Sequence, residues 1–526
     1  MPGQFRQRER LAGVLKTDSF EITFSLAESG LRRRMSTQSR LWGLHGRKHS
    51  YCESTTAVHF FDLFRCVEPL GSGSCFALPP ASLQAYATKK IEKLSSLWHF
   101  LATDISTVQA PWRISMTMQR REFLQAIGGA SLAGSLITYG STAAAASSGV
   151  PAFGFSDDRV PMNAANLCPM PSIVSDAHAR YVSELDLDLS SVNRKRIEAM
   201  KESARSNIAG LLGVSADEVA IVRNTSEANN VIVSGVPLEA GDEVVLWDQN
   251  HPSNSTSWEV RAARAGIEIR RFSVPTDTGS IDEVVDLFVD TVSDKTRVVS
   301  FTHISNITGF RIPVKEICEA IRKRKDDVHI HVDGAQTLGA VDINLGRVDC
   351  DSFSASAHKW FMGPREVGML FVRERRIEDV WPLTVSVPWG VADSPPKGAR
   401  KFDALGQRDD AAIASLGDAA AFHAAMTPAG IEKQSMMIAN RLRAGLQDLE
   451  VPFVSTANPL FTSSVIILKA PRENASTMVN QVFDESGVIT APVGGFRMSP
   501  HVYNTAAHVD RILAAIKKSR GLLGNG

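Results

Sequence analysis

The sequence lacks the cysteine arrangements that build metal sites or disulfide-stapled folds. Its 526 residues contain six cysteines, and no two of them form a Cys-x-x-Cys pair. No cluster of histidine, cysteine and acidic residues has the spacing of a metal site. We therefore expect neither a bound metal nor a disulfide scaffold.

An excess of charge and a long apolar run are also missing. The 57 basic and 57 acidic residues give a formal net charge of zero, which offers no basis for binding nucleic acid or an anionic membrane. The apolar run at residues 123–139 is short and interrupted by glycine and serine, so it is too weak to span a membrane. The composition, 44% hydrophobic and 22% charged, is that of a globular protein large enough for two domains.

One stretch has the pattern of an export signal. Residues 118–148 read MQRREFLQAIGGASLAGSLITYGSTAAAASS, with adjacent Arg120 and Arg121, a glycine-rich apolar stretch and small residues suited to signal peptidase. This pattern indicates a twin-arginine signal at residues 118–146 and a periplasmic or exported protein. Because such a signal works only at a terminus, we expect residues 1–117 to be an extension outside the native protein, with translation starting at Met116 or Met118.

Beyond the signal, short apolar segments alternate with helical ones. This alternation predicts an α/β fold with a mostly parallel sheet covered on both faces, whose ligand site lies at the carboxyl ends of the strands. The helical pattern dominates after about residue 400, which suggests a smaller α+β C-terminal domain. The expected strands are 219–223, 242–247, 267–274, 296–305, 328–336 and 368–374.

Chemically useful side chains follow several of these strands. Lys359 lies in SASAHKW, and lysine is the usual Schiff-base former. Asp333 and Gln336 lie in HVDGAQ, where an aspartate could pair with a pyridine nitrogen. Thr225 and Ser226 lie at a strand-to-helix turn, which is a natural phosphate cradle. Each piece alone is also explained by a helix cap, a turn or the surface, but the ordered combination points to one kind of cofactor.

Together these motifs resemble the class V aminotransferase family, which comprises pyridoxal-phosphate (PLP) enzymes of fold type I. The family includes cysteine desulfurases and isopenicillin N epimerase-like proteins. The resemblance runs from about residue 163 to 511. It implies a seven-stranded, mostly parallel sheet in a large domain (171–395), a small C-terminal α+β domain (396–526) and an N-terminal segment over the active site (147–170).

The resemblance also implies how the cofactor is held. Lys359 would form the Schiff base, Asp333 would pair with the pyridine nitrogen, and Gln336 would contact the ring oxygen. His251, in NHPSNSTSW, would stack on the pyridine face and act in catalysis. The other cofactor-binding residues implied are Thr225, Ser226, Glu227, Asn306, Ser356 and His358.

Substrate and subunit contacts follow from the same resemblance. Arg497, in GFRMSPHVYNT, would clamp the substrate carboxylate in a bidentate pair, with Asn306 and Asn166 beside the substrate. Gln407 and Arg408 lie in a loop that resembles the family's contact with the partner subunit's phosphate, which implies a homodimer with shared sites. A capping histidine, a turn asparagine, a surface salt bridge and a solvated loop remain the ordinary alternatives for His251, Asn306, Arg497 and the 407–408 pair.

The expected function is a PLP-dependent enzyme that deprotonates Cα of an amino acid or amino-acid-like amine, with an aminotransferase as the first choice. An isopenicillin N epimerase-like enzyme and a PLP-dependent lyase are alternatives, and a catalytically silent PLP-binding protein is the alternative of another class. A cysteine desulfurase needs a nucleophilic cysteine shortly before the carboxylate-binding arginine. No cysteine follows Cys350, so we expect no persulfide-forming desulfurase. A nucleotide-binding α/β protein is disfavoured because there is no Gly-x-Gly-x-x-Gly motif and no P-loop.

Overall fold

The computed structural model describes residues 19–23, 115–119, 153–387 and 396–524. Residues 120–146, which carry most of the expected export signal, lie outside the described residues. Within residues 1–141, strand β1 (Ser19–Thr23) pairs antiparallel with β2 (Ser115–Gln119), in a region where the sequence has no sustained strand period. Residues 142–526 form a second compact unit, which contains every predicted site residue.

A seven-stranded sheet forms the centre of the second unit, as predicted. Its strand order is β4-β10-β9-β8-β7-β5-β6; β10 runs antiparallel to both neighbours and all other pairs are parallel. The strands are β4 (Val219–Val222), β5 (Glu243–Trp247), β6 (Glu268–Phe272), β7 (Thr296–Thr302), β8 (His329–Asp333), β9 (Ser352–Ser356) and β10 (Gly368–Val372).

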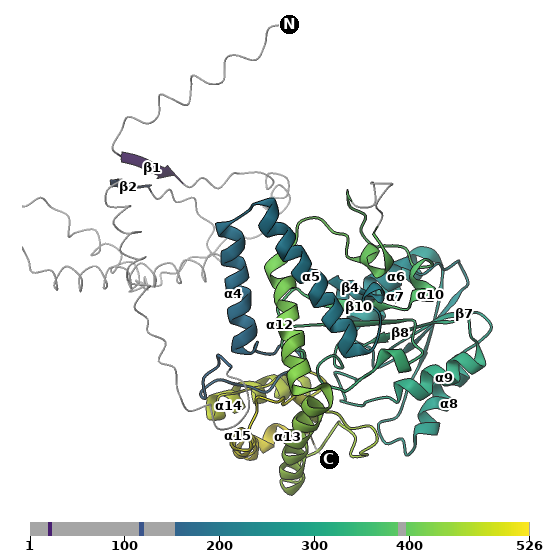
Figure 1. The fold of residues 1–526 in the computed structure, drawn as a ribbon. Helices are drawn as coiled ribbons and strands as arrows, with labels where there is room; N and C mark the ends of the chain where they lie inside the picture. The colour runs from purple at the N-terminus through teal and green to yellow at the C-terminus, as the bar shows by residue number, and fades with distance from the viewer. Residues whose placement is uncertain (1–18, 24–114, 120–152, 388–395, 525–526) are drawn as a thin grey trace, which may run out of the picture. The chain divides into compact units, whose positions relative to one another are not determined.

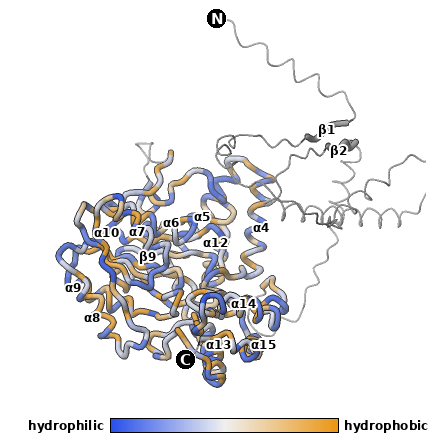
Figure 2. The backbone as a smooth tube through the Cα atoms, turned by 180° about the vertical axis from the view of Figure 1, so that it is seen from behind, coloured by the Kyte–Doolittle hydropathy of each residue, from blue (hydrophilic) through white to orange (hydrophobic). Residues whose placement is uncertain are grey.

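Helices cover both faces of this sheet because its strands are apolar on both sides. One face packs against α5, α8, α9 and α12, with Phe301 and Val332 in that core. The other face packs against α6 and α7, with Val244 and Leu370 in that core. Figure 2 shows the apolar strands inside the shell of mixed helices. The bounds are α4 (Ser172–Leu187), α5 (Ser191–Leu212), α6 (Thr225–Gly235), α7 (Pro252–Ala265), α8 (Ile281–Thr291), α9 (Val314–Arg324), α10 (Glu374–Ile377) and α12 (Asp410–Met426).

The C-terminal part has an apolar cluster of its own, around Leu442, Met478 and Ile512. Strand β3 (Val160–Pro161) joins it by pairing with β12, so the segment before residue 170 packs against the C-terminal part. A separate small domain stays a prediction. The remaining elements are α13 (Pro428–Asp448), β11 (Ile466–Leu468), α14 (Arg472–Ser486), β12 (Val488–Ile489), β13 (Phe496–Met498), α15 (Ala506–Lys518) and the 3-10 turns η2 (Ala216–Glu218), η3 (Leu345–Arg347), η4 (Gly398–Phe402) and η5 (Arg520–Leu522).

None of the helices in the described ranges is long and apolar enough to cross a bilayer. The longest, α5 and α13, carry charged residues along their length. In Figure 1 they run alongside other elements of the second unit, as surface helices of a globular protein do.

Candidate active site

The carboxyl ends of the central strands converge on a cavity of about 190 Å³. Most of the predicted cofactor residues line it, although they come from five separate stretches of sequence. Because parallel strands end at the same edge of a sheet, the residues that follow them meet there. The lining consists of Asn224, Thr225, Ser226, His251, Ser253, Thr302, Asn306, Asp333, Ala335, Gln336, Ser356, His358 and Lys359.

One end of the cavity is formed by the N-terminus of α6. Asn224 caps this helix, and its side chain accepts a hydrogen bond from the Glu227 amide at 3.0 Å. Thr225 Oγ1 lies 2.7 Å from Ser356 Oγ, which also accepts a hydrogen bond from the Thr225 amide at 2.8 Å. Hydroxyls beside the positive end of a helix dipole provide the donors that a phosphate group requires.

Lys359 also lines the cavity and is partly buried. Burial lowers the pKa of its amine to about 8, with Arg497 acting in the same direction and Asp333 opposing it. Burial and the nearby Lys359 also lower the pKa of His358, to about 4, so its imidazole is neutral. A lysine with a depressed pKa is available as a neutral amine for Schiff-base formation and proton transfer.

Asp333 ends strand β8 and is 1% exposed. Its Oδ1 accepts a hydrogen bond from the Ala335 amide at 3.0 Å, and its Oδ2 accepts one from Asn229 Nδ2 at 2.9 Å. Gln336 is held at both ends of its amide, since Nε2 donates to the Ala165 carbonyl and Oε1 accepts from Trp360 Nε1. Both side chains are therefore oriented by the protein itself.

His251 is the N-cap of α7, and its Nδ1 accepts a hydrogen bond from the Ser253 amide at 3.1 Å. Burial and the positive charge of Lys359 lower the pKa of its imidazole. His251 therefore caps α7 and also lines the cavity. A neutral, flat ring at this point suits contact with an aromatic cofactor.

Arg497, on β13, is buried and has no acidic partner among the described residues. Its guanidinium donates to the Asn306 carbonyl and to Asn163 Oδ1, both at 3.2 Å, and its Nε has no partner. Burial lowers the pKa of Arg497 to about 10. A buried, incompletely paired guanidinium is costly unless an anion binds to it.

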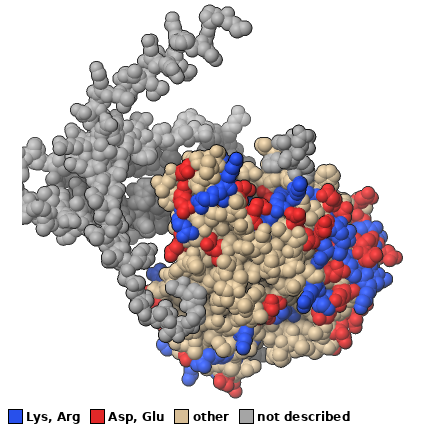
Figure 3. Space-filling view, viewed as in Figure 1, with Lys and Arg blue, Asp and Glu red and all other residues tan. Residues whose placement is uncertain are grey.

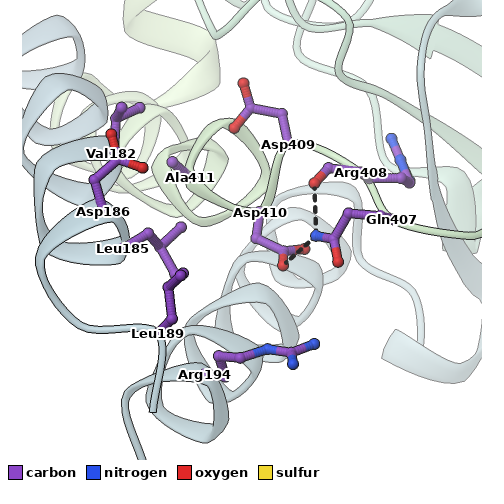
Figure 4. A pocket seen from close by; sticks show the side chains of 10 residues that line it. All are labelled: Val182, Leu185, Asp186, Leu189, Arg194, Gln407, Arg408, Asp409, Asp410 and Ala411. Carbon is purple, nitrogen blue, oxygen red and sulfur yellow. Dashed lines mark hydrogen bonds between the residues drawn. The ribbon is translucent and has the colours of Figure 1, made fainter. Parts of the chain in front are cut away.

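Five predicted contact residues do not line this cavity: Arg497, which contacts the cavity residue Asn306, and four others. The Glu227 carboxylate pairs with Arg223, and the Asn166 side chain is exposed. Gln407 and Arg408 line a different hollow, between α4 and the start of α12, where Gln407 Nε2 contacts the Arg408 carbonyl and Asp410 (Figure 4). The roles expected for these four residues stay predictions.

Several site residues were not anticipated. Asn163, and not the predicted Asn166, contacts Arg497. Asn229, which does not line the cavity, donates a hydrogen bond to Asp333. Asn229 lies on the same helix, α6, as the predicted Thr225, but its partner Asp333 is more than 100 residues away in the chain. Only Asn224 had a local signal, because asparagine before a helical run is a favoured N-cap.

A profile described as Aminotransferase class-V matches residues 169–512. The chain belongs to this family. Its members are PLP-dependent, and this chain is a PLP-dependent class V enzyme. The match confirms the resemblance inferred from the motifs, and the sheet described above is the expected fold.

The relatives include two activities. Isopenicillin N epimerase of Streptomyces clavuligerus is 26% identical over 384 residues, covering 69% of this chain and 95% of the epimerase. A cysteine desulfurase of Enterobacter sp. (strain 638) is 28% identical over 350 residues, covering 61% and 83%. Because desulfurases are among the relatives, the comparisons do not support the exclusion of desulfurase chemistry, which stays a prediction from the cysteine positions.

Solved structures show the same fold. A mutant of C-DES with glycine covalently linked to its PLP cofactor has a TM-score of 0.63 at 22% identity, covering 68% of this chain and 96% of that one. The apo cysteine desulfurase from Thermococcus onnurineus NA1 has a TM-score of 0.61 at 20% identity, covering 69% and 96%. At these identities the likeness concerns the fold alone.

The residues of the cavity fit the family's cofactor. A lysine with a depressed pKa suits its aldehyde, and a buried carboxylate at a strand end suits its ring nitrogen. Hydroxyls at the start of α6 suit its phosphate. These residues therefore match PLP at its aldehyde, its ring nitrogen and its phosphate.

Proposed function

We propose that this enzyme removes the Cα proton from an amino acid or amino-acid-like amine whose carboxylate binds to Arg497. The observation that carries the proposal is the buried Arg497 guanidinium, which has only neutral partners among the described residues. The Arg497 guanidinium donates to the carbonyl of Asn306, which lines the same cavity as Lys359. A carboxylate would satisfy the guanidinium in a bidentate pair.

The bound cofactor supplies an electron sink conjugated to the substrate Cα. The protein's own groups do the rest. Lys359, with an amine pKa of about 8, accepts the Cα proton as a general base and returns it as a general acid. Asp333 would hold a proton on the ring nitrogen through its charge, and Thr225, Ser226 and Ser356 would hold the phosphate at the start of α6. Gln336, fixed by Ala165 and Trp360, would orient the ring.

We infer an aminotransferase as the first candidate, and an epimerase as the second because isopenicillin N epimerases are among the relatives. The two differ in where the proton returns. Incubation with amino acids and small peptides in deuterated water separates them. An oxo acid supports the aminotransferase, deuterium at an inverted Cα supports the epimerase, and ammonia with an unsaturated or oxo product supports a lyase. No Cα exchange and no product with any amine would overturn the proposal in favour of a silent PLP-binding protein.

We further propose that the reaction is not cysteine desulfuration. The cysteines in the described part of the chain are Cys168, Cys318 and Cys350, and all three are buried. Burial raises the thiol pKa of Cys168 and of Cys350 to about 12, and raises that of Cys318 well above its usual value. A buried thiol is a poor nucleophile, because the attacking species is the thiolate. Formation of a persulfide on the protein after incubation with cysteine would contradict this proposal.

We also propose a homodimer. Apolar side chains are exposed on and after α4, including Leu187 at 84% and Leu189 at 73% exposure. They border the hollow of about 440 Å³ that contains Gln407 and Arg408, the residues expected to reach a partner subunit (Figure 4). Figure 3 shows dense charge over α8 and α9 but few charged side chains in the middle of this face. Exposed apolar surface of this kind is typical of a subunit interface.

Export to the periplasm through the twin-arginine route is proposed from the sequence alone. This route carries folded proteins, and a folded enzyme can leave the cytoplasm with its cofactor bound. Arg120 and Arg121 carry this proposal.

A further inference from the structure

Strands β8 and β9 carry a row of polar side chains on the face that α6 covers. The residues that alternate with these polar side chains along each strand, such as Val332 and Phe353, pack into the apolar core on the opposite face. On β5 and β10 the same side of the sheet is apolar, with Val244 and Leu370. The polar row leads from the cofactor cavity into the interior, and it comprises His329, His331, Asp333, Ser352, Ser354 and Ser356, all of them buried.

Asn229, on α6, connects Asp333 to this row. It is completely buried. Its Nδ2 donates to Asp333 Oδ2 at 2.9 Å. Its Oδ1 accepts from Ser354 Oγ at 2.5 Å and lies 3.0 Å from His331 Nε2. A carboxylate only accepts hydrogen bonds, so the amide nitrogen must face Asp333 and the amide oxygen must face the donors.

This orientation fixes the proton positions along the rest of the row. Because Asn229 Oδ1 is an acceptor, His331 Nε2 carries a proton and donates it. Burial lowers the pKa of His331 to about 3, so its Nδ1 carries no proton and accepts from Ser352 Oγ at 2.8 Å. Ser352 Oγ in turn accepts from His329 Nε2 at 2.9 Å. The hydrogen bonds therefore all run in one direction, from His329 toward Asp333.

We propose that Asn229 and His331 are positioning residues that hold the Asp333 carboxylate toward the ring nitrogen of the cofactor. The proposal rests on the role proposed above for Asp333. Asn229 occupies one lone pair of Oδ2, and His331 with Ser354 prevents the amide from turning. The other polar groups of the row are neutral, so Asp333 is its one charged group. No positive charge within the row competes with a protonated ring for the Asp333 carboxylate.

The free energy needed to bury these polar side chains argues that they do more than fill space in the core. Polar groups removed from water are destabilising unless every one is hydrogen-bonded, and apolar residues would pack at this face as they do on the adjacent strand β10. A fully bonded row instead specifies a single orientation of its last member. That member is Asp333, at the wall of the cavity.

The test uses the full-length holoenzyme loaded with PLP labelled with nitrogen-15 at the ring. The nitrogen chemical shift reports the protonation of the ring independently of turnover. In Asn229→Ala we expect a shift toward the unprotonated value and a kcat lower by about tenfold, because a hydrogen bond to a charged group is lost. In His331→Leu we expect a change in the same direction, because Asn229 loses a hydrogen bond that orients its amide. KM should stay unchanged, since Arg497 is untouched. His331→Gln, which keeps a donor near the Nε2 position, should restore the shift.

A matched control is Asn254→Ala. Asn254 is also completely buried, lies on the neighbouring helix α7 and accepts a hydrogen bond from a strand serine, Ser300 Oγ, at 2.9 Å. It makes no contact with Asp333, so this variant should keep the wild-type ring shift even where it lowers Tm. Ser352→Ala removes only one hydroxyl from the row and should give a smaller shift in the same direction. This variant serves as the test if a larger replacement unfolds the protein.

The outcomes separate two failures. If Asp333→Asn moves the ring shift but Asn229→Ala, His331→Leu and Ser352→Ala do not, the positioning role is overturned and the role of Asp333 stands. If Asp333→Asn also leaves the ring shift unchanged, the role proposed for Asp333 is wrong. A shift in Asn254→Ala equal to that in Asn229→Ala would show a general effect of burial and would also overturn the positioning role.

Discussion

Arg497 Nη2 donates a hydrogen bond of 3.2 Å to Asn163 Oδ1, although 334 positions separate the two residues in the chain. The contact exists because β3 pairs with β12, which brings the segment before residue 170 onto the C-terminal part. It places a neutral side chain, rather than a carboxylate, against a buried cation. The guanidinium therefore keeps its charge available for a ligand.

Replacement of Arg497 should chiefly weaken substrate use. Arg497→Ala removes a bidentate, charge-assisted pair, and we expect kcat/KM to fall by roughly 10- to 150-fold, from about 1.5–3 kcal/mol. Arg497→Lys keeps the charge but loses the fork, so it should restore part of the loss. Steady-state kinetics on the amine identified by the deuterium experiment measure this. Unchanged kcat/KM in Arg497→Ala would remove the carboxylate role.

The reactivity of Lys359 toward the cofactor should follow its depressed pKa. Below a pH of about 8 the amine is protonated and is not a nucleophile; above it the amine is neutral. The rate at which apo protein becomes yellow with added PLP should therefore rise with pH and level off above pH 8. Nα-acetyl-lysine with PLP is the control, and its rise should continue to higher pH. Lys359→Ala should stay colourless and trap no cofactor with borohydride; equal trapping there would place the Schiff base elsewhere.

A charge placed in the exposed apolar surface after α4 should disrupt the proposed dimer. We expect Leu189→Glu to shift the protein from dimer to monomer in analytical ultracentrifugation, because the introduced carboxylate would be buried without a partner. Met437→Glu, at a 61% exposed position on α13, is the matched control and should remain dimeric. A wild-type protein that is monomeric at micromolar concentration would contradict the dimer.

The export signal can be tested by conservative substitution. Arg120→Lys combined with Arg121→Lys should retain the protein in the cytoplasm, while Arg113→Lys should leave export unchanged. The intact mass of the periplasmic form should correspond to an N-terminus shortly after residue 146. A mature N-terminus well upstream of Ala143 would contradict both the signal and the expected start at Met116 or Met118.

The cofactor residues could be found from the sequence because each lies in a short motif directly after a strand. Thr225, Asp333, Gln336 and Lys359 need only the strand alternation and the common edge of a parallel sheet to come together. Their roles were inferred from local chemistry and from resemblance. The same local signals predicted the core strands except β9, which has serine at alternate positions.

Glu227 shows the limit of a motif-based assignment. It lies two residues after Thr225 in the same turn, yet its carboxylate pairs with Arg223 and also accepts from the Arg223 amide. The motif specified where the turn lies but not which side chains point into the cavity. That choice depends on the helix direction and on the nearest competing charge.

The sequence by itself determined the family, the alternating strands and helices, and the residue types at each strand end, because all of these depend on local pattern. Only the tertiary structure decided which asparagine supports each charged group. Asn163 reaches Arg497, and Asn229 reaches Asp333, because sheet pairing and helix packing bring distant segments within hydrogen-bonding distance. An asparagine side chain has the same hydrogen-bonding capacity everywhere in a sequence, and its partner is set by the packing around it.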